Sequence, residues 1–127
     1  MASGMTTPKE RRQAPRVAER VSVAITEAGE ALRTETTNLS TSGAYCTLER
    51  FIPPMTKLQL QFELPNGGRR VHVECAGVVV RVEPVIATPE QGRYHVAIFF
   101  TDVTERDRSA IATFVRERLA AKASTSS

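Results

Sequence analysis

Hydrophobic and polar residues alternate with a period of two along most of the chain, the pattern of strands that bury one face and expose the other. Between residues 58 and 64, every even position is leucine or phenylalanine, and every odd position is glutamine or glutamate. Similar short runs, separated by turn residues, predict six antiparallel strands. These strands cover residues 21–26, 32–39, 43–48, 58–64, 71–82 and 94–100.

The segments between these strands have the composition of turns. Glu27-Ala-Gly-Glu30 and Pro65-Asn-Gly-Gly68 are typical of hairpin turns, and Pro53-Pro54 interrupts any regular element. Inside the longest strand, the apolar residues change from odd to even positions at Ala76-Gly77. This change of phase predicts a β-bulge or sharp bend there, with even-numbered valines facing inward after it.

After the last strand the hydrophobic period changes to that of an amphipathic helix. Thr104 stands before the helical segment as an N-terminal cap, and we expect the helix to cover residues 104–121. Six strands and one helix predict a mostly β protein, a small closed barrel over residues 21–101 with the helix following it. The apolar face of the helix has spacings i, i+3, i+4 and i+8 and consists of Ile111, Phe114, Val115 and Leu119.

The bulk properties predict one cytoplasmic domain. At 127 residues the chain has the length of a single domain with a modest core. Residues 1–8 and 122–127 are small and polar, and we expect both ends to be disordered. The sequence has no signal-peptide core and no run of about twenty apolar residues, so we expect no membrane insertion. Cys46 and Cys75 lie in apolar runs, which predicts buried free thiols in a reducing compartment.

Basic residues are concentrated near the beginning of a chain whose overall charge is almost balanced. The net charge is +3. A local basic cluster on such a protein favours a discrete anionic ligand over general coating of nucleic acid. The acidic residues between positions 9 and 20 are Glu10 and Glu19, and the basic residues are Lys9, Arg11, Arg12, Arg16 and Arg20.

Two short motifs carry the candidate chemistry. Arg12 and Arg16 stand four residues apart, and Pro15 keeps them out of a helix. In an extended segment their Cα atoms lie about 13 Å apart at most, from about 3.3 Å per residue. The second motif, Asn38-Leu-Ser-Thr-Ser-Gly43, puts an amide, a hydroxyl and a glycine on a strand-to-strand turn. Guanidinium groups pair in a fork with phosphate and with the O6 and N7 edge of guanine, so the motifs suit a ligand that carries both.

Read together as RxxxR followed by [D/N]xSxxG, the two motifs resemble the signature of the PilZ domain, a bacterial receptor family for cyclic di-GMP. The resemblance covers about residues 9–119 and includes the Gly-Ala opening of the third strand and the valine-rich fifth strand. It implies a PilZ domain over residues 9–121, with a flexible ligand-binding arm at 9–20. The barrel of this family is six-stranded and antiparallel and ends in a C-terminal helix.

The same resemblance assigns roles to the motif residues. Arg12 and Arg16 would contact phosphate and guanine. Asn38 and Ser40 would hold a guanine edge or a phosphate. Gly43 would shape the turn, either through a positive φ or by leaving room for a close backbone approach.

Several residues bear on how well this site matches the family. The amide of Asn38 offers one uncharged acceptor to the N1–H and N2–H donors of guanine, so it binds them less well than aspartate does. Ser42 stands where many members have a second glycine, and Ala97 stands where the last strand often has glycine. Arg11 adds a third guanidinium, which would let the site hold two stacked ligands instead of one. The sequence leaves both stoichiometries open.

The resemblance implies a stand-alone cyclic di-GMP receptor that is not an enzyme and uses no cofactor or metal. Its output would pass to an unidentified effector protein when the ligand orders the arm. The processes implied are motility, pili, exopolysaccharide or virulence. His72 and His95 have no carboxylate or cysteine at a spacing that indicates a metal or acid–base site, and no nucleophile motif surrounds Ser40.

Two alternatives remain open. The first is a PilZ-fold adaptor that binds only protein and has lost nucleotide binding, which Asn38 and Ala97 favour. The second is a basic-armed barrel on RNA or single-stranded DNA, which would need a ladder of exposed aromatic side chains on a strand face. Tyr45, Tyr94 and the five phenylalanines form no such ladder, so nucleic acid is not the expected partner.

Overall fold

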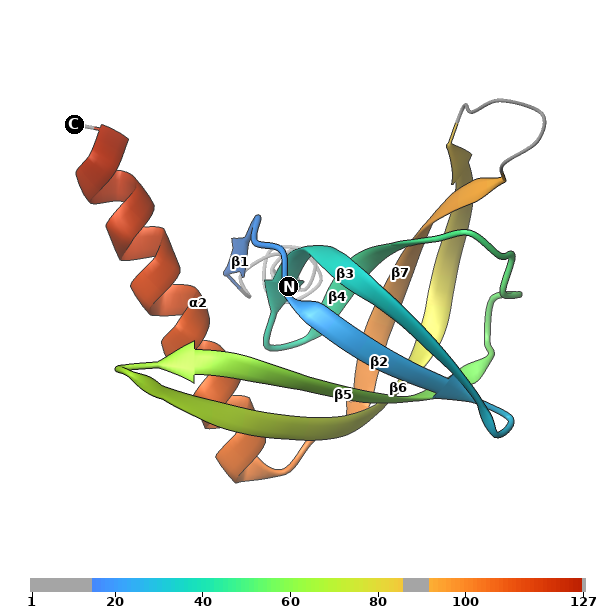
Figure 1. Ribbon diagram of the computed structural model, residues 1–127, viewed down its shortest axis with the longest axis horizontal. Helices are drawn as coiled ribbons and strands as arrows, with labels where there is room; N and C mark the ends of the chain where they lie inside the picture. Colours follow the sequence, from blue (N-terminus) through green and yellow to red (C-terminus); the bar gives the residue numbers. More distant parts are fainter. Residues whose placement is uncertain (1–14, 86–91, 127) are drawn as a thin grey trace, which may run out of the picture.

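The computed structural model describes residues 15–85 and 92–126 of the chain. The first part of the predicted arm, including Arg11 and Arg12, therefore lies outside the described residues. Seven strands and one helix form within them (Figure 1). They are β1 (Arg16–Val17), β2 (Ser22–Glu27), β3 (Glu30–Ser40), β4 (Gly43–Leu48), β5 (Lys57–Asn66), β6 (Arg69–Val85), β7 (Arg93–Asp102) and α2 (Glu105–Ser126).

The strands close into a barrel. Their order is β3-β2-β5-β6-β7-β4, and β4 pairs back onto β3, with every pairing antiparallel. The predicted six-stranded antiparallel barrel is therefore confirmed. β1 is an additional strand that pairs with the last residues of β3. The sequence pattern does not predict β1, because two residues carry no periodicity.

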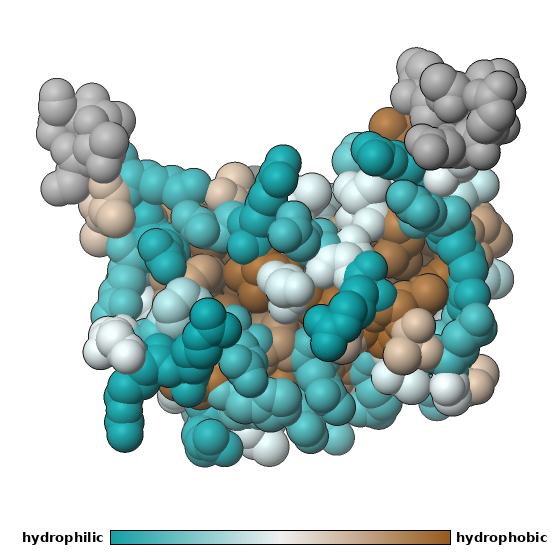
Figure 2. All heavy atoms as spheres, viewed as in Figure 1, coloured by the Kyte–Doolittle hydropathy of each residue, from teal (hydrophilic) through white to brown (hydrophobic). Residues whose placement is uncertain are grey.

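The core fills the barrel and continues beneath α2. In β5 the even-numbered residues from Leu58 to Leu64 are buried, and the glutamines and the glutamate between them are exposed. Between β4 and β5, Ile52 is buried and plugs the barrel, whereas Phe51 and Met55 on the same loop are exposed. On the face shown in Figure 2, hydrophilic side chains cover most of the surface and hydrophobic atoms are visible between them.

α2 packs against β1, β3, β5 and β6. Three residues of the predicted apolar face, Ile111, Phe114 and Val115, are buried, but Leu119 is partly exposed. The hydroxyl of Thr104 accepts a hydrogen bond from the Asp107 N–H (3.1 Å), which confirms the predicted cap.

The helix continues to Ser126, where the sequence predicts a disordered tail from residue 122. Composition alone suggests a loose end, but Lys122 has tertiary partners. Its ammonium donates to the Ala18 carbonyl (2.8 Å) and lies 3.6 Å from a carboxylate oxygen of Glu19. These contacts hold the last turns of the helix against the segment that follows β1.

In β6, the inward-facing positions change from odd to even at a different residue from the one that the sequence predicts. The register with β7 does shift between Ala76 and Gly77, but the odd-numbered residues of β6 continue to face inward as far as Val79, which is buried. A second shift between Val79 and Arg81 leaves Val80 outside, with 51% of its surface exposed. The first shift inserts an extra residue into β7 rather than β6, so it leaves the phase of β6 unchanged.

The two cysteines are buried and unpaired, as the sequence predicts. Burial raises the pKa of each thiol to about 12, with a smaller contribution from Asp107 and Asp102 at Cys75. We therefore expect negligible reaction of the folded protein with dithionitrobenzoate at pH 7, and no gain at pH 9, because the reactive thiolate does not form there. Both thiols should react at once in denaturant. Rapid labelling of one thiol in the folded protein would contradict this burial.

Candidate ligand-binding site

Backbone pairing brings the two sequence motifs together. β1 lies antiparallel to the end of β3, with Arg16 opposite Ser40 and Val17 opposite Leu39. Val17 and Leu39 are both buried, so they anchor this pairing in the core. The last arginine of the first motif is therefore held beside the second motif, as the combined signature predicts.

Arg16 lies over two residues of the neighbouring strands. Its Nη1 donates to Asn38 Oδ1 (2.6 Å), and its guanidinium carbon is 4.9 Å from the centre of the Tyr45 ring. A guanidinium at this distance from an aromatic face gains a cation–π attraction. The sequence analysis missed Tyr45, because only the register between β3 and β4 places it opposite Asn38. Together the amide and the ring fix the position of one cation on the outside of the barrel.

A β-bulge directs Asn38 to the outside. In β3, Thr36 faces inward opposite Cys46. With regular alternation Asn38, two residues later, would face inward too. The register shifts between Thr36 and Asn38, so Thr37 is extra and Asn38 pairs with the outward-facing Tyr45. The sequence places Asn38 on a turn. In the structure it belongs to β3, near its end.

Ser40 shapes the loop between β3 and β4 and is fully buried. Its Oγ accepts a hydrogen bond from the Ser42 N–H (3.1 Å) and lies 3.0 Å from the Ser42 hydroxyl and 3.4 Å from the Gly43 carbonyl oxygen. Side chains of this type commonly mimic a backbone turn in this way. A direct contact between Ser40 and a ligand stays a prediction, whereas its hydrogen bonds within the loop are observed.

Gly43 is required by a close backbone approach. It begins β4 opposite Phe99, and a Cβ added to it would lie 2.2 Å from the carbonyl oxygen of Ile98. Gly43 is not among the residues with a positive φ. Of the two roles that the sequence analysis leaves open, close approach is the one observed.

Thr36 supports the segment that connects β1 to β2. Its buried hydroxyl accepts a hydrogen bond from the Val21 N–H (3.0 Å) and donates to the Glu19 carbonyl (2.7 Å). Its own N–H donates to the Val21 carbonyl (2.9 Å). The hydrogen bonds of Thr36 thus take the place of strand-to-strand hydrogen bonds where the chain leaves β1 and enters β2.

We expect Thr36→Val to lower the free energy of unfolding by about 1–3 kcal/mol, because it leaves a buried N–H and a partly buried carbonyl without the Thr36 hydroxyl as a partner. Thr37→Val is the matched control, since Thr37 is exposed and its hydroxyl only donates to the Tyr45 carbonyl at the surface. Urea denaturation of both variants measures the difference. Equal midpoints for the two variants would show that the Thr36 hydroxyl does not support this segment.

α2 contacts both segments of the site. Arg108 Nη1 donates to the Thr41 carbonyl (3.4 Å), inside the second motif. Lys122 binds the chain at Ala18 and Glu19, directly after Arg16. The helix therefore touches the protein on either side of the pairing between β1 and β3.

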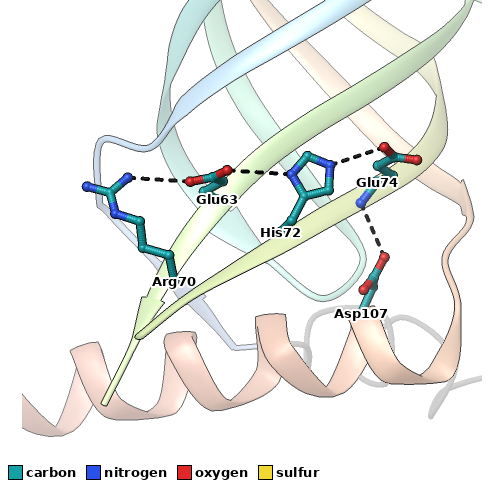
Figure 3. A network of polar contacts seen from close by, with 5 residues as sticks. All are labelled: Glu63, Arg70, His72, Glu74 and Asp107. Atoms are coloured by element: carbon teal, nitrogen blue, oxygen red, sulfur yellow. Dashed lines mark hydrogen bonds and ion pairs between the residues drawn. The ribbon is translucent and has the colours of Figure 1, made fainter. Parts of the chain in front are cut away.

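A second polar cluster lies on β5 and β6 (Figure 3). His72 contacts carboxylates of Glu63 (3.7 Å) and Glu74 (3.1 Å), Arg70 contacts Glu63 (3.5 Å), and the Glu74 N–H donates to Asp107 (3.2 Å). The sequence analysis missed the contact of His72 with Glu63, because Glu63 comes from the adjacent strand. The charged side chains of β5 and β6 are largely exposed, and the contact to Asp107 ties β6 to α2.

Other classes of feature are absent from the described residues. Among residues 15–85 and 92–126, no group of three or more His, Cys, Asp or Glu side chains is arranged to hold a metal ion. In the same part of the chain, no helix has the length and apolar composition needed to cross a membrane.

The fold and the motifs agree with comparisons to known proteins. The family model for the PilZ domain matches residues 10–117, which is most of the chain. The chain therefore belongs to the PilZ domain family. No curated protein sequence matches it significantly.

Several solved structures share the fold. The Bacillus subtilis inhibitor of motility (MotI/DgrA) matches with a TM-score of 0.76 and 23% identity, over 88% of this chain and 53% of that one. The PilZ domain of Escherichia coli YcgR with c-di-GMP matches with a TM-score of 0.65 and 15% identity, over 91% and 98%. PlzA from Borreliella burgdorferi, in complex with c-di-GMP, gives 0.58 and 5%, over 94% and 58%. The chain thus spans about half the length of MotI/DgrA.

Proposed function

We propose that this protein is a receptor for cyclic di-GMP that binds its ligand on the outer face of β3 and β4. The observation that carries the proposal is the position of Arg16, which pairs through its backbone with Ser40 and lies over Asn38 and Tyr45. The family supports the same ligand, since the YcgR and PlzA structures that share this fold are described with c-di-GMP.

The chemistry of the ligand suits this arrangement. Cyclic di-GMP has two phosphates and two guanines, and a guanidinium can pair with either group or lie flat on a purine. Arg16 is exposed and already oriented, so binding does not have to order it first. Arg12 and Arg11, farther along the arm, would supply further guanidinium groups, and Arg11 would decide between one and two bound ligands.

We propose that the signal leaves through the arm and α2. Ligand held between residues 9–20 and the barrel would order the arm, and Lys122 and Arg108 would transmit the change to α2. The output would be contact with an effector protein in the cytoplasm, in control of motility or exopolysaccharide, with no catalytic step. The description of MotI/DgrA as an inhibitor of motility supports this class of output.

Isothermal titration with cyclic di-GMP tests the receptor. We expect a dissociation constant of about 1 μM or tighter, equivalent to about −8 kcal/mol. The double variant Arg12→Ala/Arg16→Ala should remove the heat, and cyclic GMP should give none. Arg33→Ala is the matched control, because Arg33 is an exposed arginine of β3 that takes no part in the motif. No binding to the wild-type protein at saturating ligand would overturn the proposal.

One observation favours a second candidate, a PilZ-fold adaptor without a nucleotide. The Asn38 oxygen, the acceptor expected for guanine, is already occupied by Arg16. If this contact is permanent, the residue is not available to the ligand. The adaptor predicts no heat with cyclic di-GMP and a protein partner that binds equally well with and without the nucleotide.

The ordering of the arm has its own test. Trypsin cleaves after arginine, so Arg11 and Arg12 report directly on the arm. We expect saturating cyclic di-GMP to slow cleavage at these two sites, whereas cleavage after Arg33 in the barrel stays unchanged. Equal cleavage of the arm with and without a bound ligand would exclude ordering as the signal while leaving the receptor in place.

A further inference from the structure

We propose that a groove on the outer face of β5 and β6 is the docking site for an amphipathic helix of the partner protein, held by apolar contacts and by one ion pair to Lys57. This inference rests on the proposed function only for the existence of a protein partner. None of the motif residues proposed to hold the nucleotide lines this groove.

The groove lies where the β2–β3 turn, the start of β5, the middle of β6 and the end of β7 meet. The β2–β3 turn and the start of β5 are at the end of the barrel away from α2 (Figure 1). The volume of the groove is about 620 Å³, within the range of about 300–1,000 Å³ that is common for binding clefts. Lys57 on β5 pairs with Val78 on β6, and Gln59 pairs with Ala76. The two β6 side chains are short and half-buried, so they form a floor beside the longer, exposed side chains of β5.

Exposed apolar residues continue this floor at one end of the groove. The Met55 N–H donates to the Val79 carbonyl (2.6 Å), and the Val79 N–H donates to the Thr56 carbonyl (3.0 Å). These hydrogen bonds hold Met55 beside β6 where Val80 follows Val79. Met55 and Val80 are 74% and 51% exposed. Two apolar residues this exposed on neighbouring segments are typical of a contact surface.

The backbone of Met55 has a conformation that methionine rarely adopts. Its φ is +74°, in the left-handed region, and Ala28 on the turn that lines the groove has a φ of +51°. Among the described residues, these two are the non-glycine residues with a positive φ. Residues held in this region are costly and are concentrated at functional sites. One of the two lines the groove and the other is held at its end, which supports a function there.

Lys57 is the charged residue of the groove, and within the described part of the chain it has no carboxylate at ion-pair distance. By contrast, Arg70, His72 and Arg81 of β6 have carboxylates at 3.5, 3.1 and 3.6 Å. An ammonium group without a partner on a mostly apolar groove favours a ligand that brings a carboxylate. Nucleic acids and anionic membranes are bound by several basic side chains together, so a single lysine favours a protein.

The backbone of the groove favours a helical partner over an extended one. β6 pairs with β5 on one side and with β7 on the other, so an added strand finds no free edge there. A helix satisfies its own backbone hydrogen bonds and presents apolar side chains at positions i, i+3 or i+4 and i+7. The floor from Ala76 to Val80 is about 13 Å long at about 3.3 Å per residue, the length of a helix of about nine residues.

Site-specific photocrosslinking locates the partner. The variant Gln59→benzoylphenylalanine carries the crosslinker in the groove, and Arg69→benzoylphenylalanine is the control, because Arg69 is exposed at the far end of the β5–β6 hairpin. In cells of the source organism, we expect only the Gln59 variant to crosslink a protein, through an amphipathic helical segment with at least one acidic residue. No crosslink from position 59, equal crosslinks from both positions, or a crosslink to an extended segment or to a second copy of this chain would overturn the inference.

A synthetic peptide with the sequence of the crosslinked segment tests the contacts in the purified protein. We expect Lys57→Glu and Met55→Gly each to raise the dissociation constant of the peptide about tenfold or more. Changing the acidic residue of the peptide to lysine should restore its binding to the Lys57→Glu protein. Arg69→Glu is the matched control for the charge and should stay within about twofold of wild type. Wild-type affinity in both the Lys57→Glu and the Met55→Gly proteins would overturn the inference.

The Met55→Gly variant also separates docking from folding. Glycine adopts a positive φ without steric cost, so the urea midpoint of this variant should not fall below that of the wild-type protein. A loss of peptide affinity at an unchanged midpoint is therefore a loss of the methionine side chain from the contact.

Titration of the same proteins with cyclic di-GMP distinguishes this inference from the receptor. We expect Lys57→Glu to bind the nucleotide within about twofold of wild type. If the nucleotide binds and the peptide contacts fail, the groove is not the docking site and the receptor stands. If the peptide contacts hold and the wild-type protein binds no nucleotide, the receptor proposal is wrong and the groove belongs to an adaptor.

Discussion

Replacing Gly43 with alanine is expected to lower the free energy of unfolding by about 3 kcal/mol, at the upper end of the usual cost of overpacking. The new Cβ would lie 2.2 Å from the Ile98 carbonyl oxygen, a backbone atom that cannot rotate away. β4 must therefore move away from β7, which strains the hydrogen bond from the Phe100 N–H to the Ser42 carbonyl. Because domains of this size are stable by about 5–15 kcal/mol, urea denaturation should detect the loss easily.

Gly92→Ala is the matched control for Gly43→Ala. Among the described residues, the nearest atoms to a Cβ on Gly92 would be those of the Tyr94 side chain at 3.6 Å, which is an ordinary contact. We expect this variant to change the free energy of unfolding by about 0.5 kcal/mol or less. Equal unfolding midpoints for the two alanine variants would contradict the close approach between β4 and β7.

Replacing Arg16 with alanine is expected to weaken cyclic di-GMP binding by at least about a hundredfold, equivalent to about 2.7 kcal/mol. The variant loses a charge and a planar group that Asn38 and Tyr45 hold in place. Arg16→Lys restores the charge without the fork or the flat face, so it should recover less than about a tenth of the lost affinity. Titration calorimetry gives the ratio of the dissociation constant of each variant to that of the wild-type protein.

Stability must be measured beside affinity for Arg16→Ala. The Arg16 side chain is exposed, and β1 is anchored by the buried Val17 instead. The free energy of unfolding should therefore change by about 0.5 kcal/mol or less. Wild-type affinity in the Arg16→Ala protein would show that the ligand, if it binds, uses another surface.

The barrel could be predicted from the sequence because its strands bury one face and expose the other. The alternation in β5 and the turn residues before and after it correspond directly to the structure. Periodicity fails where a bulge inserts one residue. In β6 the exchange of phase occurs at Val80, and a run of valines gives no signal of which valine is extra. The end of α2 also differs from the prediction. The residues that Lys122 contacts lie more than a hundred residues away in the sequence, where a local pattern cannot show them.

The candidate site could be predicted only in part. RxxxR and [D/N]xSxxG identify Arg16, Asn38 and Gly43, and the structure brings these residues to neighbouring strands. The sequence cannot show that the bulge at Thr37 turns Asn38 outward, because the four residues before Asn38 are all polar and give no alternation. Tyr45 was missed for a related reason, since cross-strand neighbours depend on register rather than on spacing along the chain.

We expect cyclic di-GMP to bind the outer face of the barrel where β1, β3, β4 and β7 meet. Amide proton–nitrogen correlation spectra of the protein, recorded during titration with cyclic di-GMP, would locate the bound ligand residue by residue. We expect saturable shifts for residues 16–18, 38–45 and 95–99, with much smaller changes at residues 57–66 of β5. Shifts confined to β5 and β6 around His72, or no shifts at saturating ligand, would contradict it.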